Sequence, residues 1–266
     1  MIRADRPSPR IRLEEVSKSY RRRRGGRLDV LTGLNLEIDP RRVMTIVGPS
    51  GCGKSTILKL IAGLSPLSGG RISFEPAAER PRVGFLFQDY TSALAPWRTV
   101  IKNVELGLEI EGELSPGERR ETSLAHLERV GLKGVENSYP RELSGGMQQR
   151  VQIARVLAYA PNVLLMDEPF GSLDAQMRRL LQVDLRRILD ETHQTVVFVT
   201  HDIDEALYLG DRVIVLSRPP TKILLDLSQG DRPDHYEEFV RTNEYPELHR
   251  QIWSSLRDEL GVGDAY

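Results

Sequence analysis

The segment GPSGCGKST, at residues 48–56, constrains this chain more than any other stretch of its sequence. It fits the spacing G-x-x-x-x-G-K-[ST], in which glycines let consecutive backbone N–H groups curl around phosphate oxygens. The apolar, β-branched run VMTIVG (43–48) precedes it, and apolar residues at helical spacing follow it from Lys54 to Ala62. A strand, a glycine-rich turn and a helix in this order predict a phosphate loop that binds a nucleoside triphosphate.

The side chains of this loop are predicted to have separate roles. Lys54 is expected to reach the β- and γ-phosphates, and the hydroxyl of Ser55 to ligate Mg²⁺. Cys52 is interpreted as a small filler, and an ordinary glycine-rich turn is the alternative for the whole segment. The residues predicted to contact the nucleotide are Gly48, Pro49, Ser50, Gly51, Cys52, Gly53, Lys54, Ser55 and Thr56.

Two carboxylates end the apolar run VLLMDEP at residues 163–169. Ligands bind at the carboxyl ends of parallel strands in α/β sheets, which predicts that both carboxylates face the bound nucleotide. Asp167 is expected to hold Mg²⁺ and Glu168 to polarise the attacking water, with a solvated Asp-Glu turn as the alternative. His201 follows another apolar run, TVVFVT (195–200), and is predicted to hydrogen-bond a γ-phosphate rather than cap a helix.

Composition narrows the classes of protein further. The chain has 266 residues, and its 37 Lys and Arg nearly balance 38 Asp and Glu, which argues against a broad nucleic-acid or membrane-surface binder. Its single cysteine suits a reducing compartment. No signal peptide is expected at the N-terminus, and no apolar run reaches the ~18 residues of a membrane span. Secreted, fibrous, disordered and integral-membrane classes are therefore not expected.

The order of apolar runs predicts an α/β fold with a mainly parallel sheet that is covered on both faces. Strands are expected at 11–16, 30–38, 43–48, 82–87, 163–166, 195–200 and 212–217. Helices are expected at 54–62 and 175–190. Residues 89–160 carry helical spacing, with Ser144 as a helix cap, and are predicted to form an insertion into the α/β core.

Several residues outside these motifs are expected at the surface. The basic run Arg21–Arg24 is interpreted as a solvated hairpin tip, with a phosphate or anionic-lipid contact as the alternative. The histidines without a strand-end context, which are likewise expected at the surface, are His126, His193, His235 and His249.

The segment LSGGMQQR (143–150) predicts a second anion-binding site, because Ser144, Gly145 and Gly146 leave free N–H groups at the start of a helix. With this segment, the chain resembles the nucleotide-binding subunits of ABC transporters over nearly its whole length. Their signature motif is LSGGQ; here Met147 stands at the fifth position. The resemblance implies the ABC ATPase fold: an α/β P-loop NTPase (RecA-like) core with a mainly parallel sheet, an N-terminal antiparallel β region and an inserted α-helical subdomain.

The resemblance also implies domain boundaries. An ABC ATPase domain would span 11–236, and a short helical tail would follow at 237–266. Within that domain, the RecA-like core would comprise 11–88 and 161–217, and the helical subdomain would comprise about 89–160.

Individual residues acquire roles through the same resemblance. Tyr20 would stack on the adenine of ATP, and Gln88, in the Q-loop, would touch Mg²⁺ and sense the transporter. The implied metal ligands are Ser55, Gln88 and Asp167, and the implied catalytic residues are Glu168 and His201. The implied signature residues are Leu143, Ser144, Gly145, Gly146, Met147 and Gln148, and the implied D-loop residues are Ser172, Leu173 and Asp174.

One phosphate loop and one signature imply an incomplete site, because ABC proteins hold ATP between the phosphate loop of one domain and the signature of another. A head-to-tail homodimer with two ATP and Mg²⁺ is therefore expected, and a paralogous second cassette stays open. The implied partners are integral membrane permease subunits and, indirectly, a periplasmic or lipid-anchored substrate-binding protein. The chain would act at the cytoplasmic face of the inner membrane, as a peripheral subunit without a nucleic-acid partner.

Three stretches resemble the import ATPases for nitrate, aliphatic sulfonates and taurine: 95–108, 167–178 and 244–253. Trp97, in the first of them, would either face the membrane partner or pack within the helical subdomain. The alternatives are an ABC exporter ATPase, a soluble ABC ATPase acting on nucleic acid, and a phosphate-loop kinase or other NTPase.

Overall fold

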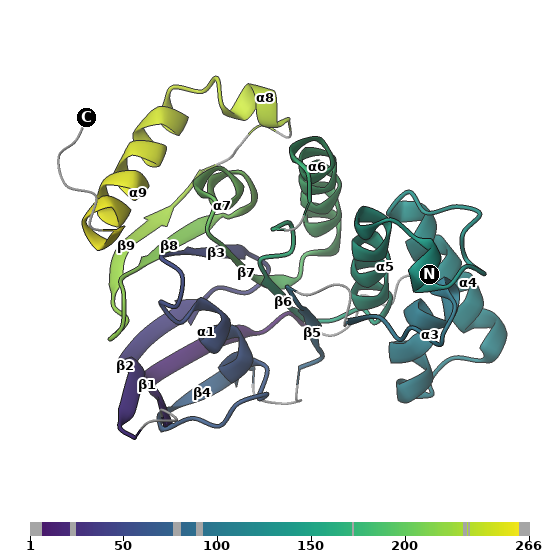
Figure 1. The fold of residues 1–266 in the computed structure, drawn as a ribbon, viewed down its shortest axis with the longest axis horizontal. Helices are drawn as coiled ribbons and strands as arrows, with labels where there is room; N and C mark the ends of the chain where they lie inside the picture. The colour runs from purple at the N-terminus through teal and green to yellow at the C-terminus, as the bar shows by residue number, and fades with distance from the viewer. Residues whose placement is uncertain are drawn as a thin grey trace.

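The computed structural model describes residues 7–21, 25–76, 81–88, 93–171, 173–230, 233 and 235–260. Within these ranges the chain forms a six-stranded sheet, in the order β5-β6-β7-β3-β8-β9, and a three-stranded antiparallel sheet, in the order β2-β1-β4 (Figure 1). The strands are β1 (Arg10–Arg21), β2 (Arg27–Ile38), β3 (Val43–Val47), β4 (Gly69–Glu75), β5 (Val83–Leu86), β6 (Val163–Asp167), β7 (Thr195–Thr200), β8 (Arg212–Leu216) and β9 (Ile223–Ser228).

Helices cover the larger sheet and extend it to one side. They are α1 (Lys54–Ile61), α3 (Val100–Glu111), α4 (Pro116–Arg129), α5 (Gly145–Ala158), α6 (Ala175–Thr192), α7 (Ile203–Leu209), α8 (Tyr236–Phe239) and α9 (Glu244–Leu260), with a 3₁₀ turn at Pro140–Glu142. Figure 1 shows α1 between the two sheets, whereas α6, α7 and α9 lie beyond the larger sheet.

The central strands are parallel and buried on both faces. β3 pairs in parallel with β7 and β8, and β6 pairs in parallel with β5 and β7, while β9 runs antiparallel to β8 at the edge. Side chains of β6 alternate between two cores: Val163 and Leu165 pack with α1 and the smaller sheet, and Leu164 and Met166 pack with the helices. This arrangement confirms the predicted α/β fold with a mainly parallel sheet and an antiparallel N-terminal region.

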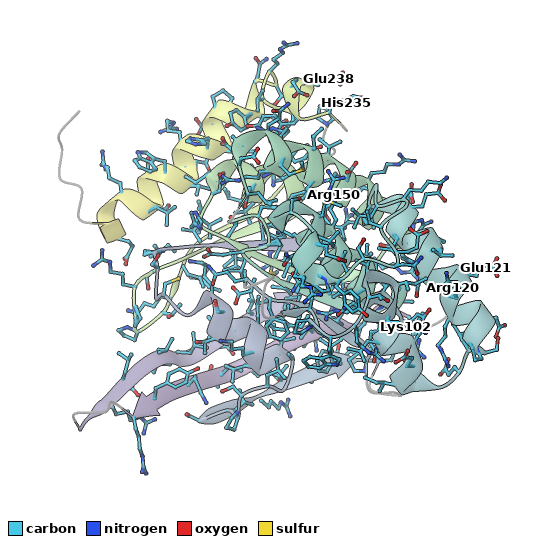
Figure 2. The ribbon with its side chains drawn as sticks, turned by 45° about the vertical axis from the view of Figure 1, so that its right-hand side comes forward. Lys102, Arg120, Glu121, Arg150, His235 and Glu238 are labelled. Atoms are coloured by element: carbon cyan, nitrogen blue, oxygen red, sulfur yellow. The ribbon has the colours of Figure 1, made fainter. Side chains whose placement is uncertain are left out.

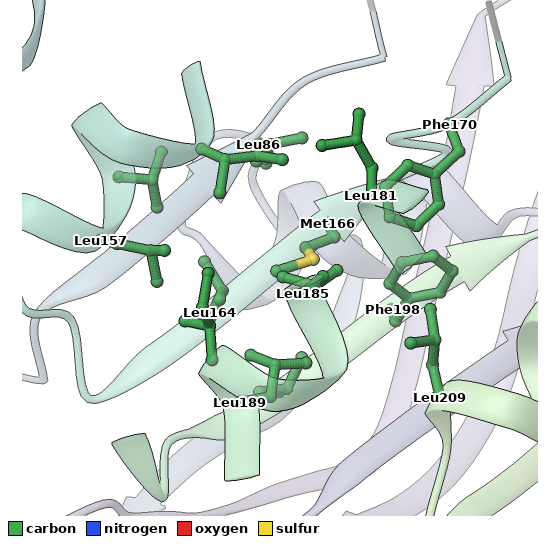
Figure 3. Close-up of a cluster of buried hydrophobic side chains, with 14 of the residues drawn as sticks. Leu86, Leu157, Leu164, Met166, Phe170, Leu181, Leu185, Leu189, Phe198 and Leu209 are labelled. Carbon is green, nitrogen blue, oxygen red and sulfur yellow. The ribbon is translucent and has the colours of Figure 1, made fainter. Parts of the chain in front are cut away.

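Helix α6 seals the second of these cores. Its residues Leu181, Leu185 and Leu189 face Leu164 and Met166 of β6 (Figure 3). Their spacing of four positions places them on one face of the helix, as the apolar periodicity predicts. The first turn of α6 is thereby held close to the carboxyl ends of β6 and β7, where ligands bind in such sheets.

Helices α3, α4 and α5 pack against one another at one end of the molecule (Figure 1). Ser115 and Glu118 form a capping box at the start of α4, which accounts for the beginning of that helix. Figure 2 shows Arg120 and Glu121 of α4 directed away from the rest of the chain. The helices occupy the region in which helical spacing was found.

Two strands lie outside the predicted elements. β4 opens with two glycines and is only partly buried, so its sequence lacks a strong strand pattern. β9 lies between the last predicted strand, which ends at residue 217, and the predicted helical tail at 237–266. Both strands complete a sheet edge, and their formation depends on a partner strand rather than on their own sequence.

The expectation of a surface position was wrong for His126. Its side chain is 8% exposed, because it lies on the inward face of α4 beside Leu127. His193 and His235 are exposed and His249 is partly exposed. Of the basic run, Arg21 pairs with Arg27 across the β1–β2 hairpin, and Arg22–Arg24 lie outside the described residues.

Candidate active site

The phosphate loop connects the buried strand β3 to helix α1 through a turn that needs glycine. Gly53 has φ +104°, a left-handed conformation that side chains disfavour, and a Cβ there would lie 2.9 Å from Cγ1 of Val30. A Cβ on Gly48 would lie 2.7 Å from Sγ of the buried Cys52. Cys52 therefore fills the inside of the turn, and burial raises the pKa of its thiol.

Lys54 lies within the curl of this loop. Its ammonium donates hydrogen bonds to the carbonyl oxygens of Gly48 at 2.7 Å and Pro49 at 3.2 Å, and the side chain is buried. The loop thus encloses one positive charge at the N-terminus of α1, where the helix dipole also favours an anion.

Ser55, the next residue, connects the loop to the acidic strand end. Its hydroxyl donates to Oδ1 of Asp167 at 2.8 Å. Asp167 is 6% exposed, and burial is the main cause that raises the pKa of its carboxyl, opposed by the Ser55 hydrogen bond. A hydroxyl and a carboxylate side by side offer two of the oxygen ligands that Mg²⁺ takes from a protein, the remainder coming from phosphates and water.

Glu168 lies between Gln88 and His201. Its Oε2 accepts a hydrogen bond from Nε2 of Gln88 at 3.2 Å and lies 3.1 Å from Nδ1 of His201. Glu168 has φ +46°, which turns its side chain out of the strand direction that Asp167 follows. A non-glycine residue in this conformation carries strain that the surroundings must hold. Two polar groups, which follow the ends of β5 and β7, thus converge on one carboxylate oxygen at the end of β6.

Tyr20 stands at the end of β1, next to the loop. Its hydroxyl lies 3.5 Å from Oγ1 of Thr56, and the ammonium of Lys18 lies 5.0 Å from the centre of its ring. The side chain is 40% exposed, so part of it is accessible to a ligand. An aromatic ring beside a phosphate loop can stack on a nucleotide base.

The signature segment lies apart from this group. Ser144 caps α5, and its hydroxyl accepts a hydrogen bond from the N–H of Met147 at 3.4 Å. Gln148 donates to the carbonyl oxygens of Pro140 and Leu143, so it braces the turn before the helix. Figure 1 shows α5 with α3 and α4, on the side of the molecule away from α1.

The D-loop lies between these two regions. Asp174 caps α6 by accepting from the N–H of Met177 at 2.9 Å, and Leu173 is buried. A Cβ on Gly146 of the signature segment would lie 3.3 Å from Cγ of Met177 and 3.7 Å from Cδ2 of Leu173. The D-loop therefore packs against the signature helix. Ser172 lies outside the described residues.

Sequence reasoning missed the groups that hold these loops in place. Thr221 lies in the turn between β8 and β9. Its hydroxyl donates a hydrogen bond to the carbonyl of Cys52 and so holds the phosphate loop against this turn. Thr200 and Glu205, on either side of His201 in the sequence, form a buried hydrogen bond of 2.6 Å. Neither pattern is recognisable in the sequence, because threonine and glutamate are common at many positions.

Among the residues that the structure describes, no helix combines the length and the apolar character that are needed to cross a bilayer. A family model described as "ABC transporter" matches residues 31–171. An ABC transporter ATP-binding protein of Methanocaldococcus jannaschii is 43% identical in an alignment of 267 positions that covers 96% of this chain and 94% of that protein.

Further relatives carry names of import systems. The aliphatic sulfonates import ATP-binding protein SsuB of Bacillus cereus is 44% identical over 80% of this chain and 83% of its own length. The nitrate import ATP-binding protein NrtC of Synechococcus elongatus is 42% identical over 88% of this chain but only 36% of its own length.

Solved structures of ABC cassettes are also similar to this chain. A dimeric bacterial ABC transporter cassette aligns with a TM-score of 0.73 and 34% identity, over 83% of this chain and all of that one. The dimeric post-hydrolysis state of an ATP-binding cassette, bound to ADP and Pi, aligns with a TM-score of 0.72 and 33% identity, over the same shares of the two chains.

Proposed function

The chain belongs to the ABC transporter family, and from this premise we propose that it is the ATP-hydrolysing subunit of an importer. The observation that carries the proposal is the convergence of Gln88 and His201 on Glu168, next to the bonded pair of Ser55 and Asp167. This group joins a phosphate loop, a candidate metal site and a candidate general base at one edge of the sheet.

Mg²⁺ binding is proposed at the hydroxyl of Ser55 and the carboxylate of Asp167, whose oxygens lie together in the fold. When bound, the ion would neutralise charge that develops on the β- and γ-phosphates. Gln88 is proposed as a further ligand that exchanges its hydrogen bond with Glu168 for the metal. Lys54 would leave the loop carbonyls for phosphate oxygens, which are stronger acceptors.

Hydrolysis is proposed to depend on Glu168 and His201. Oε2 of Glu168 would accept a hydrogen bond from the attacking water and orient it toward the γ-phosphate. Nδ1 of His201, at 3.1 Å from that oxygen, would hold the carboxylate in place. Nε2 of the same ring would then contact the γ-phosphate.

A complete site is proposed to require two chains. Gly145 and Gly146 begin α5 with backbone N–H groups that can bind an anion, yet α5 lies on the side of the chain away from α1. A second copy in head-to-tail orientation would bring its signature segment to this phosphate loop. The dimeric cassettes of similar structure support this arrangement.

The domain boundaries and the partners are also proposed from membership of this family. Residues 11–236 would form the ATPase domain, with 89–160 as its helical subdomain, and 237–266 the tail. The helical subdomain would receive integral membrane permease subunits, at the cytoplasmic face of the inner membrane. A substrate-binding protein would act through those subunits. The relatives named for sulfonate and nitrate import support a small anion as the solute.

The test uses the full chain with Glu168 replaced by Gln. This variant should hydrolyse ATP at least about 100-fold more slowly, because the water would lose its oriented acceptor. It should also double its mass in light scattering when ATP is added, because the closed dimer would not be reopened by hydrolysis. Adding Ser144→Arg to the same variant should abolish the mass change. An undiminished turnover, or a monomer at saturating ATP, would contradict the proposal.

A further inference from the structure

Helix α6 contacts Asp202 directly and Thr200 through Glu205, on either side of His201. We propose that Arg178 on this helix is a positioning residue that sets His201 for hydrolysis and links it to the D-loop. The inference rests on the proposed ATPase function, because His201 has its role only there. Arg178 lies on α6, outside the phosphate loop, the signature segment and the acidic strand end.

The guanidinium of Arg178 connects two segments. Its Nη2 donates a hydrogen bond of 3.1 Å to the carbonyl of Leu173 in the D-loop. Its Nη1 lies 3.7 Å from Oδ2 of Asp202, the residue that follows His201. The other oxygen of Asp202 accepts from two backbone N–H groups at the start of α7, so this carboxylate is held in place.

A second contact fixes the residue that precedes His201. Gln182 lies four positions after Arg178, on the same face of α6. Its Nε2 donates a hydrogen bond of 3.0 Å to Oε1 of Glu205. Oε2 of Glu205 accepts from the hydroxyl of Thr200 at 2.6 Å. The side chains of Gln182, Glu205 and Thr200 are all at least nine-tenths buried. Two adjacent turns of α6 therefore hold the backbone before and after His201.

The first turn of α6 also touches the signature helix. Met177 and Leu173 border Gly146, so α6 begins between the signature segment and the histidine. A second chain that displaces the D-loop or the signature would move Asp202 through Arg178. Arginine suits this task because its planar fork can bind two acceptors at once, which a single ammonium does less well.

The first experiment compares Arg178→Met, Arg178→Lys and Arg187→Met in the full chain. Arg187 lies on the same helix but is 82% exposed, and it pairs only with Glu191 in the described part of the chain. We expect Arg178→Met to lower kcat about tenfold with KM for ATP within about twofold, because positioning acts on the transition state. The kcat of Arg178→Lys should lie between the values of Arg178→Met and the wild type. The kcat of Arg187→Met should equal that of the wild type.

The second experiment separates positioning from general support of the fold. In a His201→Ala background, Arg178→Met should cause no further loss of single-turnover rate, because the residue it acts through is gone. An equal loss in both backgrounds would overturn the proposal, as would an unchanged kcat in Arg178→Met alone. Asp202→Asn keeps a good helix cap while weakening the ion pair, and should repeat the kcat loss if Arg178→Met does not fold.

These outcomes are distinct from a failure of the proposed function. If the wild type does not hydrolyse ATP and Glu168→Gln does not dimerise with ATP, the function itself is wrong. If both behave as expected and the Arg178 variants match Arg187→Met, only the positioning role is wrong.

Discussion

The hydroxyl of Ser55 donates a 2.8 Å hydrogen bond to Oδ1 of Asp167, and this bond joins the first turn of α1 to the end of β6. Asp167 is buried, and burial raises the pKa of its carboxyl. Glu168, the next residue, adds a like charge that acts in the same direction. A negative charge at Asp167 therefore lowers the stability of the fold, and under the proposed function its role is to bind Mg²⁺.

Asp167→Asn should accordingly stabilise the nucleotide-free chain while it removes the response to Mg²⁺ and ATP. The amide oxygen can still accept from Ser55, and a buried charge is lost, so we expect a rise in Tm of about 2–4 °C at pH 7. The wild type should gain stability with Mg²⁺ and ATP through binding linkage, and the variant should gain little. Asp184→Asn, at an exposed position of α6, is the matched control and should change neither quantity. A lower Tm in Asp167→Asn would contradict this account.

Two variants that are inactive alone should recover ATPase activity when they are mixed, if each site is shared between two chains. Lys54→Ala damages the phosphate loop, and Ser144→Arg blocks the signature segment. In a mixed dimer, the intact loop of one chain meets the intact signature of the other, so one site per dimer is complete. An equal mixture should reach up to about a quarter of the wild-type ATPase rate, since about half of the dimers are mixed. The measurement is the rate of phosphate release. If the mixture releases phosphate no faster than the separate variants, a head-to-tail dimer is excluded.

Tyr20 should contribute to ATP affinity more than to turnover. Its ring is 40% exposed beside Thr56, and base stacking on an aromatic ring is worth about 1–3 kcal/mol. We expect Tyr20→Ala to raise KM for ATP about tenfold with kcat nearly unchanged, because stacking is equal in the ground and transition states. Tyr20→Phe keeps the ring and serves as the control. Steady-state kinetics in which Tyr20→Ala changes only kcat would exclude the stacking role.

Much of the fold could be predicted because its signals are local. The phosphate loop, the cap at Ser144 and the apolar strands are each encoded within about ten consecutive residues, and β-branched runs of this kind fold as buried strands in many contexts. The positions of Asp167 and His201 at one sheet edge followed from strand polarity alone, since parallel strands share that edge.

The parts that were missed depend on residues distant in sequence. Thr221 braces the phosphate loop because β9 returns beside β8, and nothing in its own neighbourhood indicates that contact. Gln182 and Glu205 meet only after α6 and α7 have packed. His126 is buried because α4 docks against α3 and α5, so a polar helix face became an interior one.

His126 should make the stability of the helical region sensitive to acid. Burial lowers the pKa of His126, and its Nδ1 lies 2.9 Å from the carbonyl of Thr122. The unfolded chain takes up a proton near the ordinary value of about 6.5, whereas the folded chain resists it, so the unfolded state binds more protons below that pH. The free energy of unfolding should therefore fall as pH drops below about 6.5.

His126→Gln removes this titration and keeps an amide that can donate to Thr122. Urea unfolding at pH 7.5 and at pH 5.5 should show a smaller loss of stability for the variant than for the wild type. His235→Gln, at an exposed position, should lose as much stability as the wild type. If His126→Gln is as acid-sensitive as the wild type, protonation of His126 does not contribute to the acid response.

Trp97 should bind the membrane partner without affecting catalysis in the isolated chain. It lies just before α3 and is 77% exposed, so packing within the helical subdomain does not account for it. A large exposed aromatic side chain is typical of interface residues that lose about 2 kcal/mol or more of binding on truncation. We expect Trp97→Ala to keep its ATPase rate and Tm but to co-purify with permease subunits about 10-fold less well. Trp253→Ala, on α9 at the other end of the molecule (Figure 1), should co-purify normally, and equal retention by both variants would exclude this surface.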